Sequence, residues 1–341
     1  MKSIREFRDA KYGLMMHFGL YSLLAGVYRG QRGPRYAEWI QCHFKIPNAE
    51  MERLAKSFDP IYFDADEICA FAKECGMKYI VITAKHHEGF ALFASRADSF
   101  NVCDFSPFQR DIIKELSEAC VRHGLKFGLY YSQVIDWHEK HGGGYLTDPK
   151  GAAGVSWENS WDFPDKAEKN FDLCFRKKML PQIEELMTNY GEIFTAWFDM
   201  PLDSTEKHSQ EIYDLVKRLQ PDCLVNSRLG NGIYDYVSLG DNEIPDTIPE
   251  QFTETDKNSI WGMKKSPYGL YESACTLNCS WGYTTAYPEW KSPEQILLNR
   301  KKLEKLGVNY LINVGLDPLG RIPVEASEIL QKVQSAYQKG L

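Results

Sequence analysis

Hydrogen-bonding side chains and large aromatic side chains occur where the short apolar runs of this sequence end. These positions hold His17, His86 with His87, Tyr131, Asp199, Arg228, Asp241 with Glu243, and Trp281. Barrel interiors are normally filled by valine, isoleucine and leucine, so this many polar groups at one set of strand ends predicts a polar pocket. Imidazole, guanidinium and carboxylate groups suit the binding of a polyhydroxylated ligand and acid–base chemistry upon it.

One carboxylate stands out among these residues. Asp199 stands in the segment AWFDM, at the end of the clearest of the predicted buried strands, where a carboxylate without a partner would be costly and therefore usually has a task. Most glycosidases need two carboxyl groups, one that attacks or activates water and one that protonates the leaving oxygen. For the second group we favour Glu243, followed by Glu272, which we expect rather to orient other side chains; Glu38, Asp241 and Glu250 remain open.

Several other kinds of catalytic site lack their usual pattern here. Barrel metallohydrolases typically carry His-x-His, whose side chains point the same way from a strand, whereas His86 and His87 are adjacent. None of the nine cysteines has Cys-x-x-Cys spacing, and no Gly-x-Ser-x-Gly or glycine-rich phosphate loop occurs. We therefore expect neither a metal nor another cofactor.

The composition excludes several classes of protein. Of the 341 residues, 43% are hydrophobic and 26% are charged, which is typical of a globular protein with a large core. Forty Lys and Arg stand against 47 Asp and Glu without any basic patch, so we expect no nucleic-acid partner. No apolar run is long enough to span a membrane, and the charged opening MKSIREFRDA is unlike a signal peptide. The protein is therefore expected to be cytoplasmic, or secreted or periplasmic if a leader has been removed, and its cysteines are expected to be reduced.

The elements that must position these residues alternate between strands and helices along nearly the whole chain. Eight strands are predicted, within residues 11–19, 78–86, 126–132, 192–200, 222–228, 234–241, 274–283 and 309–315. Such alternation indicates a parallel sheet wrapped by helices. We therefore predict the α/β class and a (β/α)8-like TIM barrel, as a single catalytic domain over residues 1–341.

The predicted helices lie between most of these strands. Their expected ranges are about 64–76, 111–124, 165–191, 205–219, 292–307 and 324–339. No helical pattern separates the fifth, sixth and seventh strands, so the barrel is expected to be irregular, with some helices missing or replaced by loops. Long connections at 20–61, 133–164 and 242–273 follow strand ends, where the active site of such a barrel lies.

Several segments, taken in order, make the chain resemble glycoside hydrolase family 29, the α-L-fucosidases. They are KYGLMMHFGLYS, YAEWI, KHHEGF following an FDADE helix, LKFGLYYS, WFDM, NSR, YESACTLNCSWGY and NYLINVGLDPLGRIP. Together they span about residues 11–325. The sequence departs from the family pattern at Phe18 and Tyr271, where tryptophans are common, and no C-terminal β-sandwich is expected within this chain.

The resemblance implies retaining hydrolysis of terminal α-L-fucose through a covalent glycosyl-enzyme, without a metal. It implies that Asp199 is the nucleophile and that the acid/base stands in a variable loop, where Glu243 best fits the usual position. The fucose pocket it implies is lined by His17, Glu38, Trp39, His86, His87, Tyr131, Trp197, Arg228 and Trp281. The expected partner is therefore a fucosylated oligosaccharide.

Two alternatives to this function differ in what the carboxylates do. A non-enzymatic carbohydrate-binding barrel would keep the aromatic residues and histidines but would not need Asp199. A retaining glycosidase for another sugar would keep both carboxylates and differ in the hydroxyl-binding groups. The sequence leaves open the linkage cleaved, transglycosylation and the oligomeric state.

Overall fold

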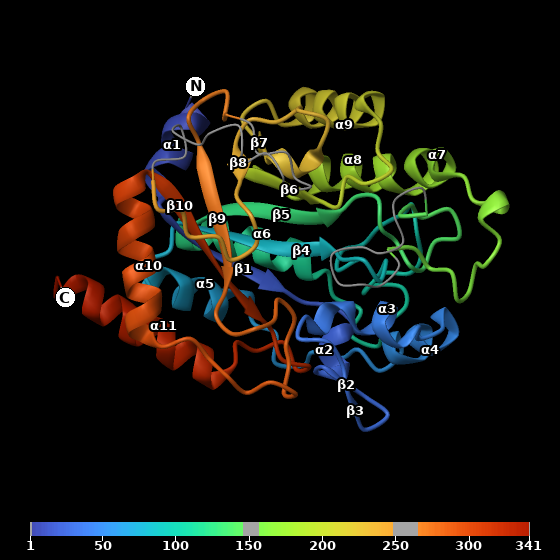
Figure 1. The fold of residues 1–341 in the computed structure, drawn as a ribbon, viewed down its shortest axis with the longest axis horizontal. Helices are drawn as coiled ribbons and strands as arrows, with labels where there is room; N and C mark the ends of the chain where they lie inside the picture. The colour runs from blue at the N-terminus through green and yellow to red at the C-terminus, as the bar shows by residue number, and fades with distance from the viewer. Residues whose placement is uncertain (1, 146–156, 248–264, 341) are drawn as a thin grey trace.

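Eight parallel strands form a sheet that curls into a barrel-like wall, and the computed structural model describes residues 2–145, 157–247 and 265–340 of the chain (Figure 1). The strands are β1 (Tyr12–His17), β4 (Tyr79–Lys85), β5 (Lys126–Ser132), β6 (Thr195–Asp199), β7 (Leu224–Val225), β8 (Val237–Ser238), β9 (Tyr271–Thr276) and β10 (Val308–Gly315). Their order in the sheet is β7-β6-β5-β4-β1-β10-β9-β8. The predicted (β/α)8-like architecture is therefore confirmed.

The two edge strands of the sheet meet through a minimal contact. β7 and β8 have only two residues each, and a single parallel bridge joins Asn226 to Tyr236. The carbonyl of Val225 accepts hydrogen bonds from the backbone N–H groups of Asp235, at 2.8 Å, and Tyr236, at 3.3 Å. The irregularity predicted from the sequence thus falls at this seam, where only a short 3-10 turn, Ser227–Leu229, connects the strands.

Side chains alternate between the two faces of the wall, as the period of a strand requires. Leu129 and Tyr131 of β5 face outward into the main apolar core beneath the helices, whereas Tyr130 faces the barrel interior. The interior is unusually aromatic, and its buried members include Tyr79, Tyr130, Trp197, Tyr236 and Trp281. The rings of these tyrosine and tryptophan side chains fill the barrel, and their O–H and N–H groups can form hydrogen bonds at its open end.

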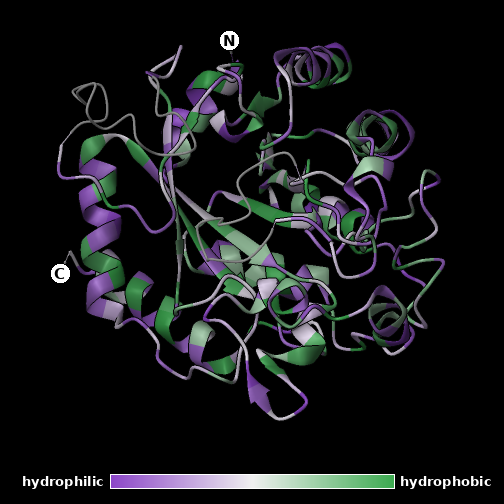
Figure 2. Ribbon diagram, turned by 45° about the vertical axis from the view of Figure 1, so that its right-hand side comes forward, coloured by the Kyte–Doolittle hydropathy of each residue, from purple (hydrophilic) through white to green (hydrophobic). Residues whose placement is uncertain are grey.

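The helices around the sheet begin at the predicted caps. Asp64 accepts a hydrogen bond from the N–H of Glu67, Asp111 from Lys114 and Ser292 from Gln295. The main helices are α1 (Lys2–Ala10), α5 (Ala65–Glu74), α6 (Ile112–His123), α9 (Glu206–Leu219), α10 (Pro293–Leu306) and α11 (Val324–Gln338). In Figure 2 the ribbons of the helices around the sheet contain both hydrophobic and hydrophilic residues, as expected of helices that cover a sheet. None of the described helices has the length and apolarity needed to cross a membrane.

The prediction of one continuous helix over residues 165–191 is wrong. It is divided into a 3-10 turn at Lys166–Glu168, α7 (Phe171–Cys174), a π-helical turn at Phe175–Met179, and α8 (Leu180–Asn189). Pro181 lacks an N–H group, and its ring crowds the carbonyl of the preceding turn, so a wider turn is accommodated just before it. The sequence pattern alone did not reveal this break.

The connection at residues 20–61, expected to be a loop, contains short elements of its own. These are α2 (Tyr21–Leu24), the hairpin of β2 (Val27–Tyr28) and β3 (Gln31–Arg32), a 3-10 turn at Ala37–Trp39, α3 (Ile40–Phe44) and α4 (Asn48–Ala55). The charged N-terminal segment, for which no helix was predicted, forms α1. These elements are short, so their apolar periodicity is weak in the sequence.

The seventh predicted strand is displaced toward the N-terminus. It was expected to begin at Ala274, but β9 begins at Tyr271 and pairs with Val308 of β10. Glu272 therefore lies inside the strand rather than before it, fully buried. The hydrophobic pattern excluded Glu272 from the predicted strand because its side chain is of a charged type. In the structure its carboxyl group is buried among hydrogen-bond donors, which permits this residue type inside a strand.

Helix α1 closes the end of the barrel opposite the strand carboxyl ends. Phe7 packs inside, with its ring centroid 4.5 Å from that of Tyr236 and 5.8 Å from that of Phe194. Phe7 is 1% exposed. The N-terminal helix therefore acts as a plug that completes the aromatic core.

We expect Phe7→Ala to lower the free energy of unfolding by about 3–5 kcal/mol, because it leaves a cavity among rings that cannot collapse freely. Chemical denaturation measures the loss. Arg5→Ala on the exposed face of the same helix is the matched control and should change stability by less than ~0.5 kcal/mol. Equal stability of the two variants would show that the plug does not stabilise the barrel.

Candidate active site

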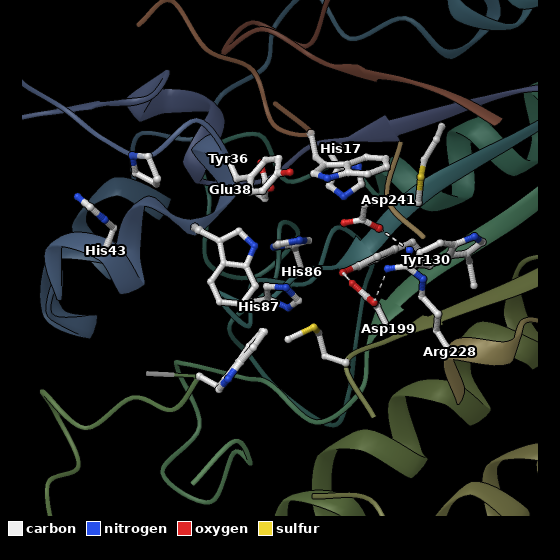
Figure 3. A pocket seen from close by; sticks show the side chains of 17 residues that line it. His17, Tyr36, Glu38, His43, His86, His87, Tyr130, Asp199, Arg228 and Asp241 are labelled. Atoms are coloured by element: carbon white, nitrogen blue, oxygen red, sulfur yellow. Dashed lines mark hydrogen bonds and ion pairs between the residues drawn. The ribbon is translucent and has the colours of Figure 1, made fainter. Parts of the chain in front are cut away.

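A cavity of about 450 Å³ opens at the carboxyl ends of the strands (Figure 3). Its polar lining consists of His17, Glu38, His43, His86, His87, Tyr130, Asp199, Arg228 and Asp241. Its remaining lining consists of Met15, Pro34, Tyr36, Trp39, Trp157, Trp197, Met200 and Trp281. Segments far apart in the sequence thus meet here because parallel strands bring their carboxyl ends to one rim.

Asp199 lies at the end of β6, on the floor of the cavity. The hydroxyl of Tyr130 donates to its Oδ2 at 2.8 Å, and Arg228 Nη1 lies 3.4 Å from its Oδ1. Burial raises the pKa of Asp199 above its ordinary value, while the charge of Arg228 and the hydrogen bond from Tyr130 act in the opposite direction. The carboxylate is therefore held in a fixed orientation with two donors that favour its ionised form.

Arg228 links this carboxylate to a second one. Its Nη2 donates to Asp241 Oδ1 and to the carbonyl of Leu239, the latter at 3.2 Å. Its guanidinium lies over the ring of Trp197, 4.7 Å from the centroid. Arg228 is 2% exposed, and among the described residues it forms ion pairs with Asp199 and Asp241.

Three histidines form one wall of the cavity. The rings of His86 and His87 lie 3.9 Å apart, and that of His17 lies 5.4 Å from His86. Although they are adjacent, His86 and His87 both line the cavity, because the extended conformation of β4 ends at Lys85. Burial lowers the pKa of His17 to about 4 and those of His86 and His87 well below their ordinary value, so all three are neutral near pH 7.

Glu38 contributes a carboxylate from the connection after β1. Its Oε2 accepts a hydrogen bond from the N–H of Gly282 at 2.8 Å, while its buried Oε1 has no partner among the described residues. Burial raises its pKa to about 7. The free oxygen can therefore accept a hydrogen bond from a ligand hydroxyl.

Glu272 lies beneath the cavity rather than in it. Tyr79 donates to its Oε2 at 2.7 Å, and the indole N–H of Trp197 donates to its Oε1 at 3.0 Å. Burial raises its pKa to about 7. Glu272 therefore supports the ring of Trp197 and is not among the residues that line the cavity.

The placement of Tyr131 in the predicted pocket is wrong. Its hydroxyl donates to Gln182 Oε1 at 2.7 Å, behind the sheet, and the preceding Tyr130 faces the cavity instead. In register, Tyr130 pairs with Trp197 and Tyr131 with Phe198. Because Trp197 and Asp199 share one face of β6, this parity was the signal that could have identified Tyr130.

The structure also separates the acidic candidates after the sixth strand. Asp241 lines the cavity, whereas the carboxylate of Glu243 accepts a hydrogen bond from the N–H of Gly240 at 2.7 Å and does not line it. Asn242, in the left-handed region, fixes the turn, because its N–H donates to Ala274 and its Oδ1 accepts from Thr276. Glu250 lies outside the described residues.

The other predicted lining residues, His17, Glu38, Trp39, His86, His87, Trp197, Arg228 and Trp281, lie together around the cavity. Sequence reasoning missed the lining residues Met15, Pro34, Tyr36, His43, Tyr130, Trp157 and Met200. Of these, Met15, Tyr36, Tyr130 and Met200 lie within recognised family motifs. Trp39 packs edge-on against His87, at 4.9 Å, and against Trp157, at 5.3 Å. In the described part of the chain, no group of three or more His, Cys, Asp or Glu side chains is arranged to hold a metal ion.

Known proteins that resemble this chain in sequence are described as alpha-L-fucosidases. The sequence model of the family described as alpha-L-fucosidase matches residues 1–338. A putative alpha-L-fucosidase of Caenorhabditis elegans is 26% identical over 96% of this chain and 63% of its own length. The alpha-L-fucosidase of Dictyostelium discoideum is 24% identical over 93% of this chain and 66% of its own length. The chain therefore spans slightly less than two thirds of these curated relatives.

Solved structures agree with the sequence matches. The unliganded alpha-L-fucosidase AlfC from Lactobacillus casei is 54% identical, with a TM-score of 0.92, covering 100% of this chain and 99% of that chain. The alpha-L-fucosidase from Vibrio sp. strain EJY3 is 33% identical, with a TM-score of 0.86, over 99% of this chain and 55% of that chain. The match of the family model over nearly every residue establishes that this chain belongs to the α-L-fucosidase family.

Proposed function

We propose that the protein is a retaining α-L-fucosidase that removes terminal α-linked L-fucose from oligosaccharides or glycoconjugates. The observation that carries this proposal is the pair of carboxylates, Asp199 and Asp241, bound to one guanidinium in the cavity at the carboxyl ends of the strands. Mutants of AlfC in complex with 4-nitrophenyl-a-L-fucopyranoside and with Fuca(1,6)GlcNAc support the choice of substrate class.

Asp199 is the proposed nucleophile. Its carboxylate attacks the anomeric carbon of fucose, the glycosidic C–O bond breaks, and a covalent glycosyl-enzyme with inverted configuration forms. Water then attacks the same carbon, releases Asp199 as a carboxylate and restores the original configuration. Tyr130 and Arg228 are suited to this role because their hydrogen bonds aim the carboxylate and favour its ionised form.

Asp241 is the proposed general acid and base, in place of Glu243. In the first step it protonates the leaving glycosidic oxygen, and in the second step it removes a proton from the attacking water. Retaining enzymes hold their two carboxyl groups about 5 Å apart, and binding to adjacent nitrogens of Arg228 keeps Asp199 and Asp241 close. Glu243 is less suited, because its carboxylate is occupied by the turn at Gly240.

The rest of the cavity suits a 6-deoxy sugar. Neutral imidazoles, the free oxygen of Glu38 and Arg228 can bind the three ring hydroxyls of fucose. The indole and thioether groups of the lining offer apolar contact to the C6 methyl group and the ring C–H bonds. A site that binds each hydroxyl would discriminate strongly against sugars lacking one.

We also propose that residues 1–341 act as one catalytic domain in the cytoplasm. One sheet runs from β1 to β10, which supports a single domain. Seven of the nine cysteines are buried, where a thiol can serve as a small apolar side chain, and proteins that keep their cysteines as thiols are typical of reducing compartments.

Replacing the nucleophile should abolish turnover. We expect Asp199→Gly to lower kcat on an aryl fucoside by several orders of magnitude, because no covalent intermediate can form. Added azide should enter the vacated space and give β-fucosyl azide, identified by NMR. Because rescue requires an intact site, it also controls for folding. Near-normal turnover without azide would show that Asp199 is not the nucleophile.

The general acid is tested by comparing Asp241→Asn with Glu243→Gln. Only substrates with poor leaving groups need the proton, so Asp241→Asn should slow fucosyl-oligosaccharide cleavage far more than the fucosylation step on an activated aryl fucoside. Glu243→Gln should slow both by less than about tenfold. If the leaving-group dependence follows Glu243 or Glu272→Gln instead, Asp241 is not the acid.

The two adjacent tyrosines of β5 should affect the pH profile differently. Tyr130→Phe removes a hydrogen bond that favours ionised Asp199, so its pKa should rise further and the acidic limb of kcat/KM should move up by about one pH unit. Tyr131→Phe is the control and should leave this limb in place, because its hydroxyl contacts Gln182. An unchanged profile for Tyr130→Phe would contradict its role beside Asp199.

A further inference from the structure

Two of the cavity histidines are held from behind by hydrogen bonds that lead to backbone carbonyl groups. His17 contacts Asn313 of β10, and His87 contacts Ser132 at the end of β5. A carbonyl oxygen can only accept a hydrogen bond, so it dictates the donor and acceptor roles of every group along such a chain. The carbonyl group at the end of each chain of hydrogen bonds therefore determines which nitrogen of the histidine ring carries the hydrogen.

The chain behind His17 begins at the carbonyl of Trp281. Asn313 lies 2.8 Å from this oxygen, so the atom facing it must be the donor Nδ2, since the opposite amide orientation would place two acceptors in contact. Asn313 Oδ1 then faces His17 Nδ1 at 2.7 Å and accepts from it. His17 Nδ1 therefore carries the hydrogen.

The chain behind His87 begins at the carbonyl of Ile135. Ser132 Oγ lies 2.8 Å from this oxygen and must direct its single hydrogen toward it. The hydroxyl oxygen is then left as an acceptor for His87 Nδ1, at 2.7 Å. His87 Nδ1 carries the hydrogen for the same reason as in His17.

We propose that Asn313 and Ser132 are positioning residues that fix the tautomers of His17 and His87, so that each ring presents an unprotonated Nε2 to the cavity. This inference deepens the proposed function, on which its consequence for the substrate rests. Neither Nε2 hydrogen-bonds to the described part of the protein. A sugar hydroxyl that contacts either histidine must therefore donate its hydrogen.

This arrangement constrains recognition in a way that the residue types alone do not. A neutral imidazole can donate or accept through Nε2, depending on its tautomer. With both rings fixed as acceptors, a hydroxyl is bound well, but a fluorine at the same place has no hydrogen to donate. The guanidinium of Arg228 can only donate hydrogen bonds, so a ligand atom that contacts it must be an acceptor.

The tautomers can be read directly in the unliganded protein by long-range ¹H–¹⁵N NMR of the imidazole rings at pH 7. His17→Gln and His87→Gln spectra assign the signals. We expect the Nδ1–H tautomer for both rings, with Nε2 at the downfield position of an unprotonated nitrogen. An Nε2–H tautomer or an imidazolium at either ring would overturn the proposal, whether or not the protein cleaves fucosides.

The positioning role of Ser132 is tested by Ser132→Ala, with Ser106→Ala as the matched control. Ser106 is also a buried serine whose hydroxyl donates to a backbone carbonyl, that of Val102 at 2.7 Å, but it contacts no histidine. Ser132→Ala should mix the His87 tautomers and lower kcat/KM roughly tenfold. Ser106→Ala should change neither. A His87 tautomer unchanged in Ser132→Ala would refute the assignment.

Asn313→Leu provides the same test for His17, with Asn309→Leu as its control. Asn309 lies four residues earlier in β10 and, like Asn313, uses both ends of its amide: it accepts from the N–H of Lys11 and donates to the carbonyl of Phe7, at the opposite end of the barrel. The two variants should lose similar stability, but only Asn313→Leu should change the His17 tautomer. An identical His17 spectrum in both variants would refute the role of Asn313.

The consequence for the substrate is tested by binding to Asp199→Ala, using L-fucose and its monodeoxy and monofluoro analogues at C2, C3 and C4. At the positions that face His17 and His87, the fluoro analogue should bind as weakly as the deoxy analogue, roughly tenfold weaker than fucose. Fluoro analogues that bind like fucose at every position would overturn the inference. Failure of fucose itself to bind would instead refute the proposed function, while the NMR result would still stand.

Discussion

The buried guanidinium of Arg228 is the interaction on which the geometry of the site depends. A positive charge with almost no exposure must be paired, and in the described part of the chain Asp199 and Asp241 both pair with it. One positive charge faces two carboxylates, so removing the guanidinium would leave two like charges close together, and the three groups are coupled. The requirement to neutralise this charge also holds the two proposed catalytic groups at a short separation.

The layer beneath this ion group consists of aromatic side chains joined by hydrogen bonds. Trp197 supports the guanidinium with its face and donates its N–H to Glu272, which also accepts from Tyr79. Below them, Phe7 closes the barrel against Tyr236. The floor of the cavity is thus continuous with the core, so the proposed nucleophile, Asp199, rests on well-packed elements rather than on a loop.

The histidine wall has a separate support behind β4. Lys85 and Lys178 both pair with the buried Asp136, at 3.0 and 2.8 Å. The next residue, Trp137, donates its backbone N–H to the carbonyl of His87 at 2.7 Å. Buried charges thus fix the loop after β5 against the loop after β4, which holds the adjacent rings of His86 and His87 in the cavity.

Much of this protein could be predicted from the sequence because the relevant signals are local. Alternating apolar patterns and caps predicted all eight strands of the barrel and most of its helices, and the strand-end residues predicted a polar site containing Asp199, Arg228 and the histidines. The family motifs then indicated fucose as the expected sugar. These features need only the period of a strand or helix and the rule that parallel strands end on one rim.

Tertiary structure decided the features that depend on which face a residue takes and on where a loop goes. The parity of β5 selected Tyr130 over Tyr131, and burial among donors drew Glu272 into β9. The turn fixed by Asn242 brought Asp241 to Arg228 and engaged Glu243 with Gly240. The sequence could not distinguish these acidic residues, because charge pairing between segments distant in the chain, rather than local periodicity, determines which carboxylate enters the cavity.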